Sequence, residues 1–206
     1  MKLTKSRVEI NMNLDLKILA EQADILRKSK KNNINANKKE FKKSAVLILL
    51  NKTDYGYKTF LIKRAETGGK HSGQIAFPGG KYCLQDITLK RTALREAKEE
   101  IGINNKNIEI ITKLNEVYIP VSKHRVRPYI AYTNESLKLK ANPGEVEKII
   151  EIQLKTILET NKSEEIVDVR GEKEKRKGYR LNGVFVWGAT ANIMDEFVEI
   201  LKKACK

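Results

Sequence analysis

The chain has 206 residues and a 40 % hydrophobic content, which is enough for one packed domain with an extension. Its longest apolar run, Ala45 to Leu50, is far shorter than the about 20 residues of a membrane-spanning helix, and no apolar segment follows the basic N-terminus. The net charge of +15 is compatible with a polyanionic ligand. The basic stretches of the chain, however, lack the interleaved aromatic residues that bind single-stranded nucleic acid.

The two cysteines, Cys83 and Cys205, lie far apart without the spacing of metal ligands. Together with the absence of a membrane or secretory segment in the sequence, this usage predicts a cytoplasmic protein and no membrane partner.

Residues 1–43 are expected to form a basic N-terminal extension with one helix, and residues 44–206 a separate domain. Apolar residues recur at helical spacing between charged ones in 14–28, which predicts the helix. Residues 29–43 are polar and lysine-rich, as in a linker. The helix is expected either to pack on the following domain or to aid formation of a homodimer, and the sequence does not choose between these roles.

The rest of the chain predicts an α/β layered domain, because strands alternate with two substantial helices. Strands are expected over residues 44–50, 57–63, 108–119, 126–132, 145–152 and 179–187. Helices are expected over residues 88–100, 154–158 and 189–203. The glycine-rich stretch 65–86 is expected to be a long loop, and loops of this length in compact domains are often functional.

The first long helix of this domain carries three glutamates on one face. At about 100° per residue, Glu96, Glu99 and Glu100 lie within an arc of about 100°. Like charges at this spacing disfavour a helix by roughly 0.3 kcal/mol, whereas Mg²⁺, which takes oxygen ligands and is shared with substrate phosphates, would reverse the sign. The alternative is an ordinary solvated helix face that Arg95 and Lys98 neutralise.

The helix and the glycine turn before it together resemble the Nudix box, whose general form is G-x5-E-x7-R-E-U-x-E-E-x-G-U. The matching positions are Gly80, Arg95, Glu96, Glu99, Glu100 and Gly102. Gly80 and Arg95 are separated by 14 residues, where the general box has 13. The first glutamate of the box is missing, and its place falls near Asp86 or Ile87. A one-residue insertion with an aspartate resembles the coenzyme A pyrophosphatase branch of the family.

Two flanking segments resemble the same branch. Residues 61–80 are similar to its signature L-L-T-x-[TR]-[SA]-x3-R-x3-G-x3-F-P-G-G, and residues 186–191 to a segment near its C-terminus. The arginine of the signature falls on Gly69, with Lys70 adjacent, and an ammonium group lacks the bidentate fork of arginine. Coenzyme A and another nucleoside diphosphate compound, such as ADP-ribose, a dinucleotide or a nucleoside triphosphate, therefore both stay open as substrates.

The resemblance implies a Nudix-type α/β/α sandwich with a mixed sheet, and hydrolysis of a pyrophosphate bond that depends on Mg²⁺ or Mn²⁺. With coenzyme A as the small-molecule nucleotide substrate, the products would be 3′,5′-ADP and 4′-phosphopantetheine. The implied metal ligands are Glu96, Glu99 and Glu100, and Arg95 would fix the rotamer of a box glutamate. The implied substrate-binding residues are Arg64, Lys70, Gly73, Phe77, Gly79 and Gly80.

The general base is left open by the resemblance. It is either a box glutamate, such as Glu99 or Glu100, or a residue of the segment that contains Glu145 and Glu147. Histidine is the side-chain type suited to acid–base chemistry near neutral pH, but we expect His71 and His124 to be surface residues and assign neither as the base. A rival interpretation, a basic nucleic-acid-binding protein, predicts salt-dependent binding without hydrolysis, and it leaves the clustered carboxylates unexplained.

Overall fold

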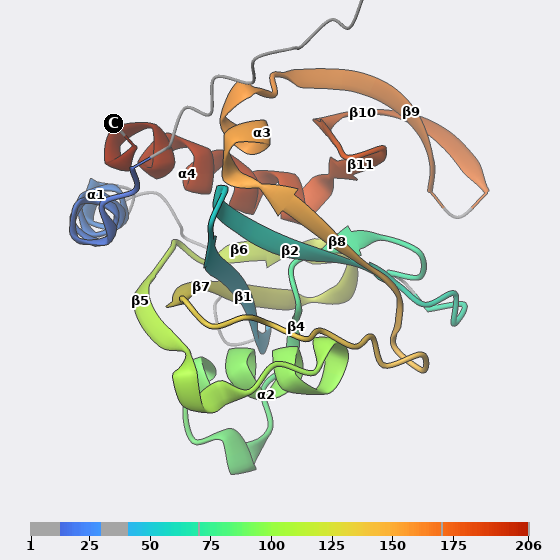
Figure 1. Cartoon of the computed structure of the whole chain (residues 1–206). Helices are drawn as coiled ribbons and strands as arrows, with labels where there is room; N and C mark the ends of the chain where they lie inside the picture. The colour runs from blue at the N-terminus through green and yellow to red at the C-terminus, as the bar shows by residue number, and fades with distance from the viewer. Residues whose placement is uncertain (1–12, 30–40, 70, 170, 206) are drawn as a thin grey trace, which may run out of the picture.

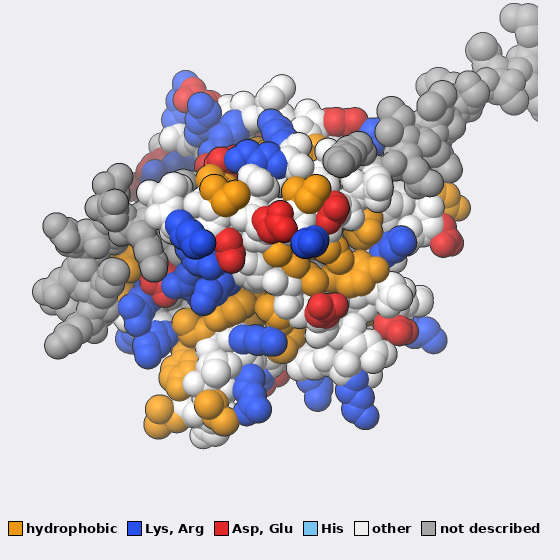
Figure 2. Space-filling model, turned by 90° about the vertical axis from the view of Figure 1, so that its left-hand side faces the viewer, with side chains coloured by type: hydrophobic (Ala, Val, Ile, Leu, Met, Phe, Trp, Pro, Cys, Tyr) orange, Lys and Arg blue, Asp and Glu red, His pale blue; other side chains and the backbone are white. Residues whose placement is uncertain are grey.

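The computed structural model describes residues 13–29, 41–69, 71–169 and 171–205 (Figure 1). Most of the linker predicted over 29–43 lies outside these residues. None of the described helices is long and apolar enough to cross a membrane. On the face drawn in Figure 2, lysine and arginine side chains are spread among acidic and apolar ones.

A mixed sheet lies at the centre of the molecule. Its strands are β1 (Lys42–Thr53), β2 (Gly56–Arg64), β3 (Ile75–Ala76), β4 (Gly79–Lys81), β5 (Glu109–Lys113), β6 (Val117–Ile119), β7 (His124–Thr133) and β8 (Val146–Gln153). The main order is β3-β2-β1-β7-β5, with β4 paired to β1, β6 to β7 and β8 to β2. Because β1 runs parallel to β7 and antiparallel to β2 and β4, the predicted mixed sheet is confirmed.

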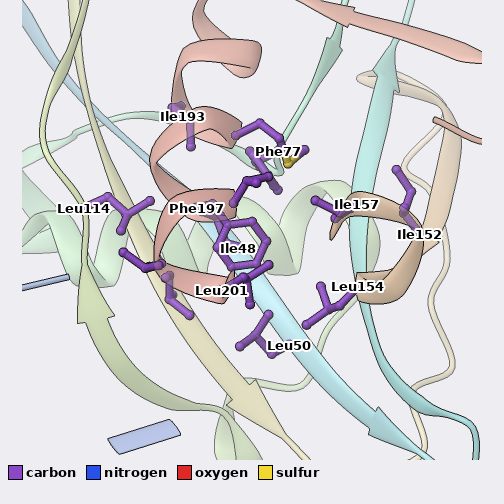
Figure 3. Packing of buried hydrophobic residues seen from close by; sticks show 14 of the residues in the cluster. Ile48, Leu50, Phe77, Leu114, Ile152, Leu154, Ile157, Ile193, Phe197 and Leu201 are labelled. Carbon is purple, nitrogen blue, oxygen red and sulfur yellow. The ribbon is translucent and has the colours of Figure 1, made fainter. Parts of the chain in front are cut away.

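Helices cover both faces of this sheet, as predicted. In Figure 1, α2 (Leu89–Ile101) lies below the sheet, and α1 (Leu16–Ser29), α3 (Leu154–Glu159) and α4 (Gly188–Ala204) lie above it. Side chains of a strand alternate between its faces, so Leu47 and Leu49 pack toward α2. Ile48 and Leu50 point the other way, toward Phe197 of α4 (Figure 3).

Helix α1 shares the core of the domain. Leu19 and Ala23 are fully buried, and the backbone N–H of Asp15 donates to the carbonyl of Ala204 at 3.0 Å. The Arg27 side chain donates to the carbonyl of Lys113 in β5 at 3.2 Å. The helix predicted over 14–28 is thus present, and it packs on α4 and β5.

A second, antiparallel sheet consists of β9 (Lys162–Val169), β10 (Glu172–Leu181) and β11 (Val184–Trp187), in the order β11-β10-β9. The single strand predicted over 179–187 is wrong, because Asn182 and Gly183 form a tight turn with φ of +46° and +83°. An Asn-Gly pair of this kind is a strong hairpin signal. The edge strand β9 carries acidic side chains, whereas β10 is rich in lysine and arginine.

Two other predictions also need correction. The expected loop over 65–86 contains β3, β4 and the 3-10 helix η2 (Leu84–Asp86). The expected strand over 108–119 is interrupted and divides into β5 and β6. The remaining 3-10 helices are η3 (Asn105–Asn107) and η4 (Pro120–Ser122).

Candidate functional site

Helix α2 is held at both ends and along its apolar face. The Thr88 hydroxyl caps its first turn, and Gly102 ends it in the left-handed conformation with φ +72°. Ala93, Ala97 and Ile101 are fully buried against the sheet. This packing turns the acidic side of the helix toward β4 and the end of β2.

Glu100 is the most deeply buried of the three box glutamates, with 1 % of its side chain exposed. Its carboxylate accepts the Gly79 N–H at 2.7 Å and pairs with Arg64 Nη1 at 3.1 Å. Burial raises the pKa of Glu100 to about 7, although the Gly79 N–H and Arg64 oppose the rise. The charges of Glu96 and Glu145 raise it further, so these three carboxyl groups lie near one another.

Glu96 occupies the space beside Gly80. Its side chain is 13 % exposed and pairs with Arg95 at 2.9 Å. Burial raises the pKa of Glu96, and the charges of Glu99 and Glu145 add to the rise. A Cβ atom on Gly80 would lie 2.3 Å from Glu96 Oε2, so only glycine leaves this carboxylate where it is.

Arg95 is anchored by Asp86, a residue for which the sequence alone predicts no role. Its Nε and Nη2 atoms donate to the two carboxylate oxygens of Asp86 at 2.7 and 3.0 Å. Asp86 also accepts the Cys83 N–H at 3.0 Å and the Thr92 hydroxyl at 2.9 Å. These donors, Arg95 foremost, hold the pKa of Asp86 well below its usual range. The sequence does contain a signal for this role, because Asp86 lies near the position at which the first glutamate of the Nudix box is missing.

Glu99 lies at the rim of the site. Its side chain is 47 % exposed and accepts from Arg95 Nη1 at 2.8 Å. Arg95 therefore contacts Asp86, Glu96 and Glu99 together, and its Nη2 also donates to the Lys81 carbonyl at 3.0 Å. The structure brings Glu96 and Glu100 together at the glycine turn and places Glu99 at the rim, on the same arginine as Glu96.

Glu145, just before β8, and Glu147, inside it, differ in their surroundings. Glu145 is exposed, accepts from Asn142 Nδ2 at 3.3 Å, and acts electrostatically on both Glu96 and Glu100. Glu147 instead pairs with Lys63 Nζ at 2.7 Å on the outer side of β2. The structure therefore separates two residues that the sequence could not rank.

The predicted substrate-binding residues differ in their backbone conformation and in their burial. Gly73 has φ +67°, and a Cβ atom there would lie 2.3 Å from Glu66 Oε1. Gly79 has φ +150° and packs directly on the backbone of β1. The side chain of Phe77 is 1 % exposed and packs in the core near α4 (Figure 3). Lys70 lies outside the described residues.

The carboxylate oxygens of Glu96, Glu99 and Glu100 are ligands of the kind that a hard divalent cation prefers. Among the described residues, no three acidic, histidine or cysteine side chains are grouped tightly enough to hold a metal ion as they stand. These carboxylates instead form ion pairs with arginine side chains, Glu96 with Arg95 and Glu100 with Arg64. The donor set nevertheless fits Mg²⁺ or Mn²⁺, since it consists of carboxylate oxygens crowded around a glycine turn that has no room for a side chain.

Known proteins share both the sequence and the fold. Residues 41–172 match the family model of the NUDIX domain. The chain is 33 % identical over 144 residues to an uncharacterized Nudix hydrolase, NudL, of Photorhabdus laumondii, a match that covers 68 % of this chain and 74 % of that protein. It is 35 % identical over 165 residues to Nudix hydrolase 15, mitochondrial, of Arabidopsis thaliana, covering 74 % of this chain and little more than half, 56 %, of that protein.

Among solved structures, the MutT protein from Methanosarcina mazei superposes with a TM-score of 0.51 at 19 % identity, covering 78 % of this chain and 92 % of that one. This likeness shows the fold alone. Nudix hydrolases generally use divalent metal ions, which agrees with the chemistry of the acidic cluster. From the family model, the relatives and the fold together, the chain belongs to the Nudix hydrolase family and is a pyrophosphohydrolase of nucleotide compounds.

Proposed function

We propose that this hydrolase cleaves the pyrophosphate bond of coenzyme A or one of its derivatives to 3′,5′-ADP and 4′-phosphopantetheine. The observation that carries the chemistry is the meeting of Glu96 and Glu100 at the Gly79-Gly80 turn. The substrate rests on the resemblance of residues 61–80 to the coenzyme A pyrophosphatase signature. It is supported by the buried Asp86, which the longer segment before Arg95 places on that arginine.

Glu96, Glu99 and Glu100 are the proposed ligands of Mg²⁺ or Mn²⁺. When bound, such an ion neutralises charge on the diphosphate and lowers the pKa of a coordinated water. Arg95 orients Glu96 and Glu99 through the ion pairs described above. Arg64 holds Glu100 and, being 34 % exposed, also has surface available for a substrate phosphate.

Glu145 is the proposed general base, because its charge acts on Glu96 and Glu100 while its own carboxylate is exposed. A positioned base contributes about 100-fold to 10,000-fold to a rate. We therefore expect Glu145→Gln to lower kcat by about 100-fold or more. Glu147→Gln is the matched control, two residues away but paired with Lys63, and it should change kcat less than about twofold. Equal losses in both variants would contradict the assignment.

The metal ligands are tested by Glu100→Gln and Glu99→Gln. Metal-dependent turnover should be abolished in both, with the far-UV circular dichroism unchanged, because each variant removes a charge that the ion requires. Near-normal turnover in either variant would remove that residue from the site.

The substrate is tested by a hydrolysis panel of coenzyme A, acyl-coenzyme A, ADP-ribose and NADH with Mg²⁺ and Mn²⁺. Product chromatography should show 3′,5′-ADP and 4′-phosphopantetheine from coenzyme A. Preferential hydrolysis of ADP-ribose or NADH would instead make the chain a hydrolase of another nucleoside diphosphate compound. That alternative is favoured by Gly69, which stands where the coenzyme A signature has an arginine.

A further inference from the structure

Both histidines of the chain lie in one positively charged cluster next to the candidate site. Burial lowers the pKa of His124, and the charges of Lys81, His71 and Lys42 lower it further, so these groups converge. We call these four residues the cation cluster. Among the described residues, no carboxylate lies within ion-pair distance of any of them. The positive charge of Lys42 and Lys81 is therefore not neutralised by a described carboxylate.

Polar atoms without partners lie in the cluster and next to it. His124 Nε2 and the hydroxyl of Ser122, two residues before His124, are both buried and have no hydrogen-bond partner among the described residues. Buried polar groups in folded proteins are nearly always paired, and exceptions point to an absent water, ion or ligand. A hydroxyl donates hydrogen bonds, and the two lysines add positive charge, so the matching ligand is an anion.

The strand register places the cluster beside the glycine turn. Lys42 pairs with His124 across β1 and β7, and Lys81 pairs with Ser44 across β4 and β1. Residues paired across strands share a face, so all three side chains lie on the α4 face of the sheet. Lys81 directly follows Gly80, whose α2-side neighbour is Glu96. Among the described strands β4 pairs only with β1, so its other edge carries no strand pairing.

The fourth member is tied to the same site through its loop. His71 Nδ1 lies 2.9 Å from Gln74 Oε1, and the Gln74 carbonyl accepts the backbone N–H of Arg64 at 3.1 Å. Arg64 in turn pairs with Glu100. The cation cluster and the acidic site are thus joined through β4 and through the loop after β2.

We infer that the cation cluster binds a second phosphate group of the substrate, a phosphomonoester on the same nucleoside as the diphosphate that is cleaved. This inference rests on the proposed function. In a nucleoside 3′-phosphate 5′-diphosphate both groups are attached to one ribose, so they must bind within the length of one nucleotide. The acidic site and the cation cluster meet at adjacent positions of β4, Gly80 and Lys81. The cluster then distinguishes substrates with a 3′-phosphate from those without it.

Binding is tested directly by proton NMR, because the two histidine rings are the only ones in the chain. The full chain, without divalent metal, is titrated with 3′,5′-ADP, 5′-AMP and inorganic phosphate. Both histidine signals should shift at an at least tenfold lower concentration of 3′,5′-ADP than of either other ligand. Equal responses to 3′,5′-ADP and inorganic phosphate would reduce the cluster to a free-phosphate site, and no shift of either ring would overturn the inference.

The kinetic test compares coenzyme A with dephospho-coenzyme A. Lys42→Gln and Lys81→Gln should each raise the KM ratio of coenzyme A to dephospho-coenzyme A by about tenfold, the effect of one charge-assisted hydrogen bond. Lys52→Gln, an exposed lysine at the other end of β1, is the matched control and should leave the ratio unchanged. An unchanged ratio in both cluster variants would overturn the inference while hydrolysis of coenzyme A stands. If the wild type does not hydrolyse coenzyme A, the proposed function fails and the NMR titration still decides the cluster.

Discussion

At the scale of single residues, a Cβ atom added at Gly79 would clash with a different kind of neighbour from one added at Gly80. A Cβ atom on Gly80 would meet the flexible end of Glu96, whereas one on Gly79 would lie 2.3 Å from the backbone oxygen of Ala45, at φ +150°. We expect Gly80→Ala to displace the carboxylate, lowering activity with little loss of stability. Gly79→Ala should lower the free energy of unfolding by about 3 kcal/mol. Thermal unfolding and hydrolysis rates separate the two effects, and a fully active Gly80→Ala variant would contradict this placement of Glu96.

Asp86 stabilises the fold only while its carboxylate is charged. Its pKa in the folded chain is held below the value of about 3.9 for an unperturbed aspartate, chiefly by Arg95. The contribution is therefore complete above about pH 5 and is lost as the pH falls through the folded pKa. We expect Asp86→Asn to be less stable by about 2 kcal/mol at pH 7, with a difference that shrinks below about pH 4. Denaturant unfolding across this range measures the difference, and a pH-independent value would contradict the ion pair.

The sequence predicts residue identities at the site better than their orientations. Helical periodicity places Glu96, Glu99 and Glu100 on one side of α2, because that arrangement depends only on local geometry. It does not predict that Arg95 keeps Glu99 at the rim, or that Glu145 comes close from a distant segment. Those contacts depend on how elements far apart in the chain pack together.

At the scale of elements, the turn before α2 holds a strained residue. Ile87 has φ +61° and ψ −44°, and the Thr88 N–H donates to the Asp86 carbonyl across it at 2.6 Å, which makes a γ-turn. The Ile87 side chain is 68 % exposed and contributes little packing. Ile87→Gly should therefore stabilise the protein by about 1 kcal/mol, raising Tm by about 3 °C.

The matched control for this turn is Leu84→Gly. Leu84 is 85 % exposed in the same turn but does not have positive φ, so its replacement adds chain entropy to the unfolded state without relieving strain. Its Tm should fall slightly, as followed by circular dichroism. A rise of the same size in both variants would show that strain at Ile87 is not the cause.

The structure confirms the helices predicted from sequence within a few residues, whereas short strands were missed. Leu89–Ile101 was expected over 88–100, since apolar spacing and the flanking Thr88 and Gly102 are local signals. The short strand Gly79–Lys81 has no such signal, because it exists only through its pairing with β1. A two- or three-residue strand cannot show an alternating pattern, so only tertiary structure reveals it.

At the scale of the whole molecule, α1 belongs to the cooperative core. Leu19 is fully buried, whereas Ile25 on the same helix is 55 % exposed. We expect Leu19→Ala to lower the free energy of unfolding by about 3 kcal/mol, a fall in Tm of about 9 °C, and Ile25→Ala to change it by less than about 1 kcal/mol. Differential scanning calorimetry should show one transition in each case. A separate low-temperature transition in Leu19→Ala would mean that α1 unfolds on its own.

The free edge of the small sheet has a consequence for self-association. Strand β9 presents Glu164, Glu165 and Asp168 along a border where a further strand could add. Glu164 and Glu165 are paired with Lys175 and Arg180 of β10. A second copy that joined here around a twofold axis would bring carboxylates of both chains together and would disturb these ion pairs. The acidic edge therefore disfavours a continuous β-sheet between molecules.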